Sequence, residues 1–255
     1  RKQLQADWVI GMRDDYDDEI GLHIHPSCSF VESAGLDCLE SPSTVYDAGD
    51  PTGYTVMCSA YSEDEFTTLL AHSDEIFMAN GLGKPTSFRA GGWTADLSTI
   101  KALARGGYVA DTSALNWARM EEWKDQQNGV LYEWNAANWT SIGDTSQPYY
   151  PSTDDVLVSG DSVVPVLEVP DNGILVDYVT TNEMIEILDA NWDGTPLSTP
   201  INYSIGWHPS NFNEVYQDRM DSIMNRLDRH LAAHHNGPVV YETLSNMTRV
   251  WTAPL

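Results

Sequence analysis

The sequence predicts an α/β fold with a mostly parallel sheet or barrel, and two observations lead to this class. Short strand-like runs alternate with longer segments whose apolar residues recur every three to four positions. This alternation is typical of βα units, in which successive strands lie parallel. Polar residues also follow several of the predicted strands directly. The carboxyl ends of strands are where barrel folds carry their function, so we expect the site there.

Most of the predicted strands are followed by a helix. Two longer stretches, residues 26–61 and 113–162, break this rhythm, and each follows a predicted strand. Because loops in that position are commonly functional, we expect both near the site. The predicted strands cover residues 19–25, 86–90, 108–112, 163–169, 201–207 and 238–242.

Two of the predicted helices begin with a capping box, in which a hydroxyl and a carboxylate three residues later bind each other's backbone N–H. Ser62 and Glu65 form one such box, and Thr180 and Glu183 form the other. Apolar periodicity predicts two further helices, one that begins near Leu97 and one over residues 213–235.

The composition fits one strongly acidic domain over residues 1–255. Hydrophobic residues make up 42% of the chain and nine residues are Trp, which suffices for a sizeable core. Against 38 Asp and Glu stand only 13 Lys and Arg, so the formal net charge is −25. Nucleic acid and anionic membrane surfaces are therefore excluded as expected partners, because their phosphates would be repelled. No apolar run approaches the roughly 18 residues of a membrane span.

Three cysteines, Cys28, Cys38 and Cys58, lie in one loop-rich region. A disulfide between two of them, with one thiol left over, is expected for an exported protein, and the alternative is three free thiols. The sequence does not decide which two would pair. We expect a secreted, periplasmic or cell-surface location.

His23 and His25 are the candidate metal ligands. Residues i and i+2 on a strand point to the same face, so both imidazoles can converge on one ion at the end of a strand. Neutral imidazole suits Zn²⁺ and similar divalent metals. The alternative is a structural pair of histidines on a buried strand.

Three further polar residues follow predicted strands. Arg89 is followed by two glycines and Trp93, and its planar fork could orient a carboxylate or the substrate. Asp111 ends the next strand, within reach of a neighbouring Arg, although it could instead cap a turn. His208 follows a late strand, where it could act as a general acid because imidazole holds an available proton near neutral pH.

These residues lie in a series of motifs that resembles the polysaccharide deacetylase superfamily. That group includes the NodB-homology domains of carbohydrate esterase family 4, and the likeness spans nearly the whole chain in the family's order. The motifs are Glu-Ile-Gly-Leu-His-Ile-His-Pro, Phe-Arg-Ala-Gly-Gly-Trp, Gly-Tyr-x-x-Asp-Thr-Ser, Leu-Glu-Val-Pro and Trp-His-Pro. The resemblance implies a distorted (β/α)7 barrel that removes acetyl groups from N-acetylated sugars with a divalent metal, often zinc.

The resemblance also implies a role for each matched residue. His23 and His25 resemble the metal-binding histidines, although many members space the pair four residues apart. Arg89 resembles the residue that braces the catalytic base, Asp111 an acidic residue that orients this network, and His208 the general acid. The residues that would wall the sugar pocket are Trp93 and Trp207.

One part of the family pattern is missing from the sequence. The family's first strand carries two Asp, one as general base and one as third metal ligand, and it precedes the histidine motif by a strand–helix unit. The 22 residues before His23 read instead as a helix and a turn, and the acidic pairs Asp14–Asp15 and Asp17–Asp18 abut the histidine strand. We therefore expect the Asp strand upstream of Arg1, as the first of seven strands.

The activity implied is metal-assisted amide hydrolysis on a polysaccharide or oligosaccharide. An activated water attacks the acetamide carbonyl, an upstream Asp takes the proton of that water, and His208 protonates the departing amine. Deacetylation of an ester oxygen remains open. Two other readings also remain open: a glycan-binding barrel that has lost catalysis, and a related hydrolase that acts on a non-sugar amide.

Overall fold

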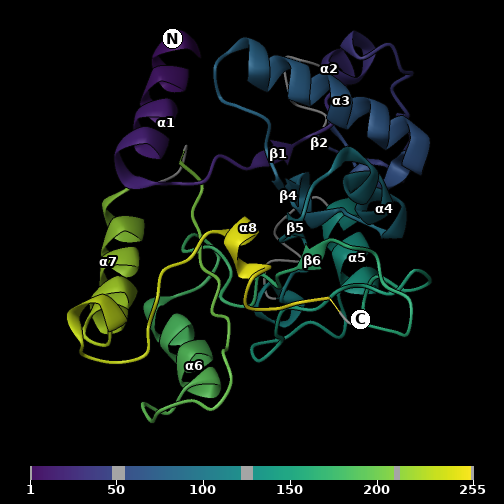
Figure 1. The fold of residues 1–255 in the computed structure, drawn as a ribbon. Coiled ribbons are helices and arrows are strands. Elements are labelled where there is room, and N and C mark those ends of the chain that lie inside the picture. Colours follow the sequence, from purple (N-terminus) through teal and green to yellow (C-terminus); the bar gives the residue numbers. More distant parts are fainter. Residues whose placement is uncertain (1, 48–54, 122–128, 210–212, 254–255) are drawn as a thin grey trace.

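The computed structural model describes residues 2–47, 55–121, 129–209 and 213–253. It confirms an α/β architecture with a parallel four-stranded sheet in the order β1-β4-β5-β6 (Figure 1). A separate antiparallel pair, β2 and β3, lies beside the sheet. The strands are β1 Leu22–Ile24, β2 Val45–Asp47, β3 Thr55–Val56, β4 Ser87–Ala90, β5 Ala110–Asp111 and β6 Leu167–Glu168.

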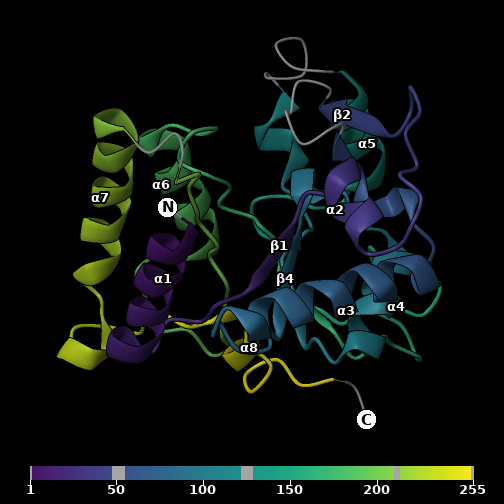
Figure 2. The same cartoon turned by 90° about the horizontal axis from the view of Figure 1, so that it is seen from above.

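The helices form two groups. α3 and α4 pack side by side beneath the sheet in Figure 2, whereas α6 packs against α7 on the other side of the molecule, where α1 also lies. Short 3-10 turns follow or connect several elements, at Cys58–Ala60, Gly91–Trp93, Trp117–Arg119 and Ala232–His234. The helices are α1 Lys2–Tyr16, α2 Cys28–Ser33, α3 Glu63–Ala79, α4 Leu97–Gly106, α5 Gly129–Asn138, α6 Thr181–Asn191, α7 Glu214–Asp228 and α8 Leu244–Met247.

Local signals position several helix ends as the sequence predicts. Ser62 and Glu65 bind each other's backbone N–H in a complete capping box at the start of α3, and Thr180 and Glu183 do the same for α6. α4 ends at Gly107, whose φ of 82° lies in the left-handed region that glycine adopts without strain.

The strand register assigns residues to the two faces of the sheet. Leu22, Phe88, Asp111 and Glu168 are successive partners across the four strands, so their side chains share one face. All four are buried. His23 pairs with Arg89 one residue further on, and their side chains therefore point to the opposite face. The sheet thus separates a buried row, which includes Asp111 and Glu168, from the more exposed pair His23 and Arg89.

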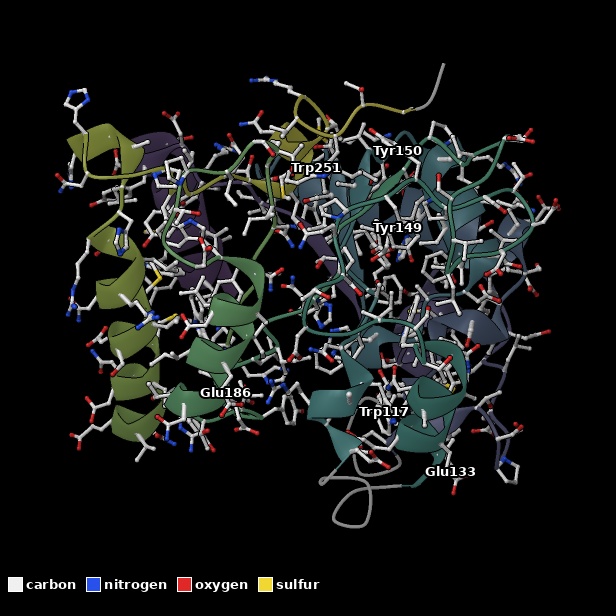
Figure 3. The ribbon with its side chains drawn as sticks, turned by 90° about the horizontal axis from the view of Figure 1, so that it is seen from below. Trp117, Glu133, Tyr149, Tyr150, Glu186 and Trp251 are labelled. Carbon is white, nitrogen blue, oxygen red and sulfur yellow. A yellow bond between two sulfur atoms is a disulfide. The ribbon has the colours of Figure 1, made fainter. Side chains whose placement is uncertain are left out.

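The apolar core consists of several clusters. One packs β1 and β4 against α3 and α4, around Phe66 and Phe88. A second gathers the aromatic residues of 113–162 with α6 and α7, and Trp139 is its largest fully buried member. A smaller cluster holds the C-terminal segment, where the Tyr150 hydroxyl donates to the Trp251 carbonyl at 3.0 Å (Figure 3).

Two predicted strands and one predicted helix are corrected by the structure. Residues 201–207 and 238–242 run irregularly, with single bridges from Gly206 to Leu175 and from Val239 to Leu231. The helix expected over 213–235 ends at Asp228, because the returning chain hydrogen-bonds its own end: the Val239 N–H donates to the His230 carbonyl at 2.9 Å. Closure into a barrel is not shown by the four-stranded sheet.

The disulfide expectation is confirmed. Cys28 and Cys38 are bonded, and Cys58 is a buried free thiol. This bond is compatible with an extracellular location. No helix in the described ranges is long and apolar enough to cross a membrane.

Candidate functional site

His23 and His25 converge as the strand spacing predicts. Their Nε2 atoms lie 2.9 Å apart, and the two rings meet edge to face. The Nδ1 atom of His23 lies 2.9 Å from the carbonyl oxygen of Arg89, its register partner on β4. Because a carbonyl only accepts, this nitrogen carries the proton and the His23 Nε2 offers a lone pair. The tautomer is assigned here from its hydrogen-bond partner.

The second ring is held from two sides. The Nδ1 atom of His25 lies 2.8 Å from the hydroxyl of Tyr46 on β2. On its other side the ring packs on Gly91, where an added Cβ would lie 2.8 Å from the imidazole and 2.6 Å from the Ile24 carbonyl oxygen. Only glycine fits there, so the first Gly of the Arg-Ala-Gly-Gly-Trp motif makes room for His25.

The electrostatic surroundings of His23 favour a neutral ring. Desolvation, and then the charge that a protonated His25 would place beside it, lower the pKa of His23 to about 3. The imidazole is therefore neutral at neutral pH, even though part of the residue is exposed to solvent.

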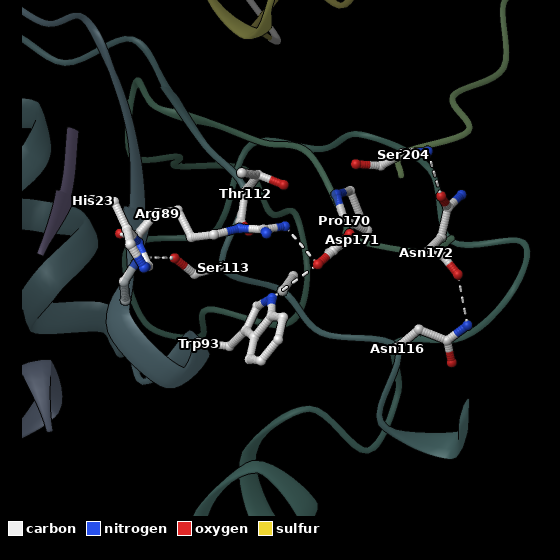
Figure 4. Close-up of polar contacts among 12 residues, drawn as sticks. His23, Arg89, Trp93, Thr112, Ser113, Asn116, Pro170, Asp171, Asn172 and Ser204 are labelled. Atoms are coloured by element: carbon white, nitrogen blue, oxygen red, sulfur yellow. Dashed lines mark hydrogen bonds and ion pairs between the residues drawn. The ribbon is translucent and has the colours of Figure 1, made fainter. Parts of the chain in front are cut away.

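Arg89 is held in one orientation by contacts with three surrounding residues (Figure 4). Its Nη2 forms an ion pair with the buried Asp171 at 2.5 Å, and its Nε donates to the Thr112 carbonyl at 3.1 Å. The guanidinium also lies over the ring of Trp93, 5.4 Å from its centroid. Among the described residues none accepts from Nη1, and the side chain is 23% exposed. Nη1 is thus an oriented donor available to a ligand.

Asp171 is one of the site residues that the sequence did not predict. It follows β6 directly after the Leu-Glu-Val-Pro motif, and it accepts from the Trp93 indole N–H at 2.9 Å as well as from Arg89. Burial raises the pKa of Asp171, and the charge of Arg89 acts in the opposite direction. Its position after a predicted strand was the available signal.

Asp111 lies below the site, on the buried face of the sheet. It accepts from the hydroxyl and the backbone N–H of Ser113, and Arg89 forms its ion pair with Asp171 rather than with Asp111. Burial raises the pKa of Glu168 well above its usual value, and the charge of Asp111 beside it adds to the shift. The two shifts together favour a proton on Glu168 rather than on Asp111.

His208 is paired with a carboxylate that the sequence did not single out. Its Nδ1 lies 2.6 Å from Asp177 Oδ2, and the Tyr178 ring packs edge-on against the imidazole. Asp177 fixes the ring orientation and favours a proton on Nδ1. The charge of a protonated His208 acts on both His23 and Asp171, so the three belong to one electrostatic cluster.

The two candidate sugar-contacting tryptophans lie in different surroundings. Trp93 is 6% exposed, and its indole supports Asp171 and Arg89 from within the second core cluster. Trp207 is 50% exposed beside His208. Contact between either ring and a substrate stays a prediction, and the exposure of Trp207 makes it the more accessible of the two.

The histidine pair could supply two nitrogen ligands to a divalent metal. Their Nε2 atoms lie 2.9 Å apart, and each ring is fixed through its Nδ1, as the rings of ligating histidines usually are. Within the described part of the chain, no group of three His, Cys, Asp or Glu side chains is arranged to hold a metal ion. His23 and His25 would therefore supply two of the ligands.

A cavity of about 320 Å³ opens beside the histidine pair. It lies between β1, α2 and α3, and its walls beyond the histidines are mostly apolar: Leu22, Ile24, Phe30, Ser73, Ile76 and Phe77. A small group held at the pair thus has space and an apolar surface next to it.

Comparison with known proteins finds no family model, no curated protein and no solved structure that matches the chain.

Proposed function

We propose that the chain is a metal-dependent deacetylase that hydrolyses the acetyl group of an N-acetylated or O-acetylated polysaccharide. The observation that carries this proposal is the convergence of the His23 and His25 Nε2 atoms at 2.9 Å, with both rings anchored. The motif resemblance supplies the substrate class.

Each anchored residue has a task in this reaction. His23 and His25 would hold the divalent metal, and imidazole ligands favour Zn²⁺. Such a metal, when bound, polarises the acetyl carbonyl and lowers the pKa of a water molecule. Arg89 presents its Nη1 N–H groups to an oxygen of the substrate, and its other donors are engaged by Asp171 and Thr112. The guanidinium therefore needs no rearrangement when the substrate binds.

In the proposed reaction, His208 delivers a proton to the leaving group. With Nδ1 engaged by Asp177, its Nε2 is the nitrogen left to hold and release the proton. The Asp177 carboxylate holds the ring in this orientation through Nδ1. A departing amine or alkoxide needs that proton, so the assignment suits both amide and ester substrates.

The test is acetate release from chito-oligosaccharides and from an acetylated xylan, measured with and without added Zn²⁺. We expect release that depends on metal and falls at least about 100-fold in His23→Ala and in His208→Ala. His230→Ala is the matched control, because this histidine lies beyond the end of α7 against Trp192. Wild-type protein that binds Zn²⁺ but releases no acetate would contradict the deacetylase proposal. Zn²⁺-dependent release from a non-sugar amide would assign the same site to that substrate instead.

A further inference from the structure

Tyr46 is a buried residue beside the site that no motif singled out. It lies on β2, 21 positions beyond His25, with its hydroxyl 2.8 Å from the His25 Nδ1. Tyr46 is only 8% exposed, and burial raises the pKa of its hydroxyl, which stays protonated. The contact is therefore between a neutral hydroxyl and an imidazole, and a hydroxyl can donate or accept.

The backbone around Tyr46 is fastened to the strand that carries the histidines. Val45 pairs with Val56 across β2 and β3, and the Val56 N–H donates to the Pro26 carbonyl at 3.0 Å, one residue after His25. The disulfide closes the intervening segment by joining Cys28 to Cys38. The strand pairing and the disulfide thus hold the segment that carries Tyr46 close to His25.

Four groups form a hydrogen-bond chain in a consistent direction. The His23 Nδ1–H donates to the Arg89 carbonyl, so the His23 Nε2 accepts. The proton between the two Nε2 atoms then belongs to His25, and the His25 Nδ1 accepts from the Tyr46 hydroxyl. If both Nε2 lone pairs bind a metal, the His25 proton must lie on Nδ1, where the oxygen of Tyr46 accepts it.

We propose that Tyr46 is a positioning residue for the metal centre, which orients His25 and exchanges its role from donor to acceptor when a divalent cation binds the pair. This inference rests on the proposed function, since it needs the metal. Hydrogen-bond partners of ligating histidines typically contribute 10–100-fold to metal affinity. Tyr46→Phe removes this hydrogen bond and keeps the ring that fills the core.

Two measurements test the proposal, and Tyr61→Phe is the matched control. Tyr61 is a second buried tyrosine of the same region, and its hydroxyl accepts from the Leu39 N–H rather than from a histidine. Nitrogen-15 NMR of the metal-free protein reports which nitrogen of His25 carries the proton. Zn²⁺ titration against a competing chelator reports affinity without any substrate.

We expect the Nε2–H tautomer at His25 in the metal-free wild type and in both variants, because the His23 Nε2 accepts this proton in each. We expect the Zn²⁺ affinity of Tyr46→Phe to fall 10–100-fold, with that of Tyr61→Phe within about 2-fold of the wild type. An unchanged Zn²⁺ affinity in Tyr46→Phe would overturn the role of Tyr46 and leave the deacetylase proposal standing, and an Nδ1–H tautomer in the metal-free wild type would overturn its role as donor. A wild type that binds no Zn²⁺ would overturn the metal centre and, with it, the role proposed for Tyr46.

Discussion

The ion pair between Arg89 and Asp171 gives the sharpest stability prediction, because the site depends on it and its surroundings are defined. Asp171→Ala removes an ion pair at 2.5 Å and the acceptor of the Trp93 indole at 2.9 Å. Removing one partner of a buried pair typically costs about 3–5 kcal/mol, since the other charge is left unpaired. Asp171 is fully buried whereas Arg89 is 23% exposed, so water partly solvates the remaining charge.

We therefore expect the free energy of unfolding to fall by about 2–4 kcal/mol in Asp171→Ala. Urea unfolding at pH 7 and constant salt measures this change, and an unchanged m-value shows that the same surface unfolds. Asp189→Ala is the matched control, because it breaks an ion pair with Arg226 in which both side chains are about half exposed. The control should lose no more than about 1 kcal/mol. Equal losses in the two variants would refute the argument that burial makes the Asp171 pair important.

Three further predictions concern pH, redox state and salt. Burial raises the pKa of Glu168, so between the unfolded and the folded pKa the folded state holds a proton that the unfolded state has released. The contribution of Glu168 to the free energy of unfolding is therefore full below the unfolded pKa near 4.5, and it is lost as pH rises through the folded pKa. Glu168→Gln, which mimics the protonated acid beside Asp111, should flatten that decline in urea unfolding between pH 5 and 9, and an unchanged slope would contradict it. The disulfide joins Cys28 to Cys38, 10 positions apart, and reducing it should lower the free energy of unfolding by about 2.5–3 kcal/mol. An unchanged free energy of unfolding after reduction would contradict the role of the disulfide in holding this loop. Added salt should raise Tm, because a net charge of −25 repels itself and the Debye length falls from about 10 Å at 0.1 M to about 3 Å at 1 M; a Tm that falls with salt would count against this.

The parts of the fold that the sequence predicts correctly are those set by neighbouring residues. The capping boxes at Ser62 and Thr180 bind groups only three positions away, so their signal is complete within a few residues. The irregular course of residues 201–207 depends instead on distant partners. The Asn172 side chain accepts from the Ser204 N–H at 2.9 Å, and Gln147 accepts from the Asn202 N–H. These backbone N–H groups therefore donate to distant side chains instead of to the backbone carbonyls of a neighbouring strand.

The candidate site was predictable in its residues but not in its pairings. His23 and His25 follow from a period of two on a strand, and the structure brings them together. The partner of Arg89 depends on register: Asp111 pairs with Phe88 across the strands, so it shares the buried face and leaves Arg89 to a residue beyond β6. Register between strands 20 or more positions apart has no local signal in one sequence.

The aromatic residues of 113–162 show the same limit. This stretch follows a predicted strand and is expected near the site, yet Trp117, Tyr132 and Trp139 are buried in the second core cluster. Large aromatic side chains serve cores and binding surfaces alike, and only the packing distinguishes the two uses.

The most direct test of the central claim, that His23 and His25 form a metal centre, is anomalous diffraction at the zinc edge from crystals grown with Zn²⁺. We expect one strong peak within about 2.0–2.1 Å of both Nε2 atoms, with the His23 Nδ1 still bonded to the Arg89 carbonyl and the His25 Nδ1 to the Tyr46 hydroxyl. Zinc bound elsewhere at saturating concentration, with the two Nε2 atoms still hydrogen-bonded to each other, would contradict it.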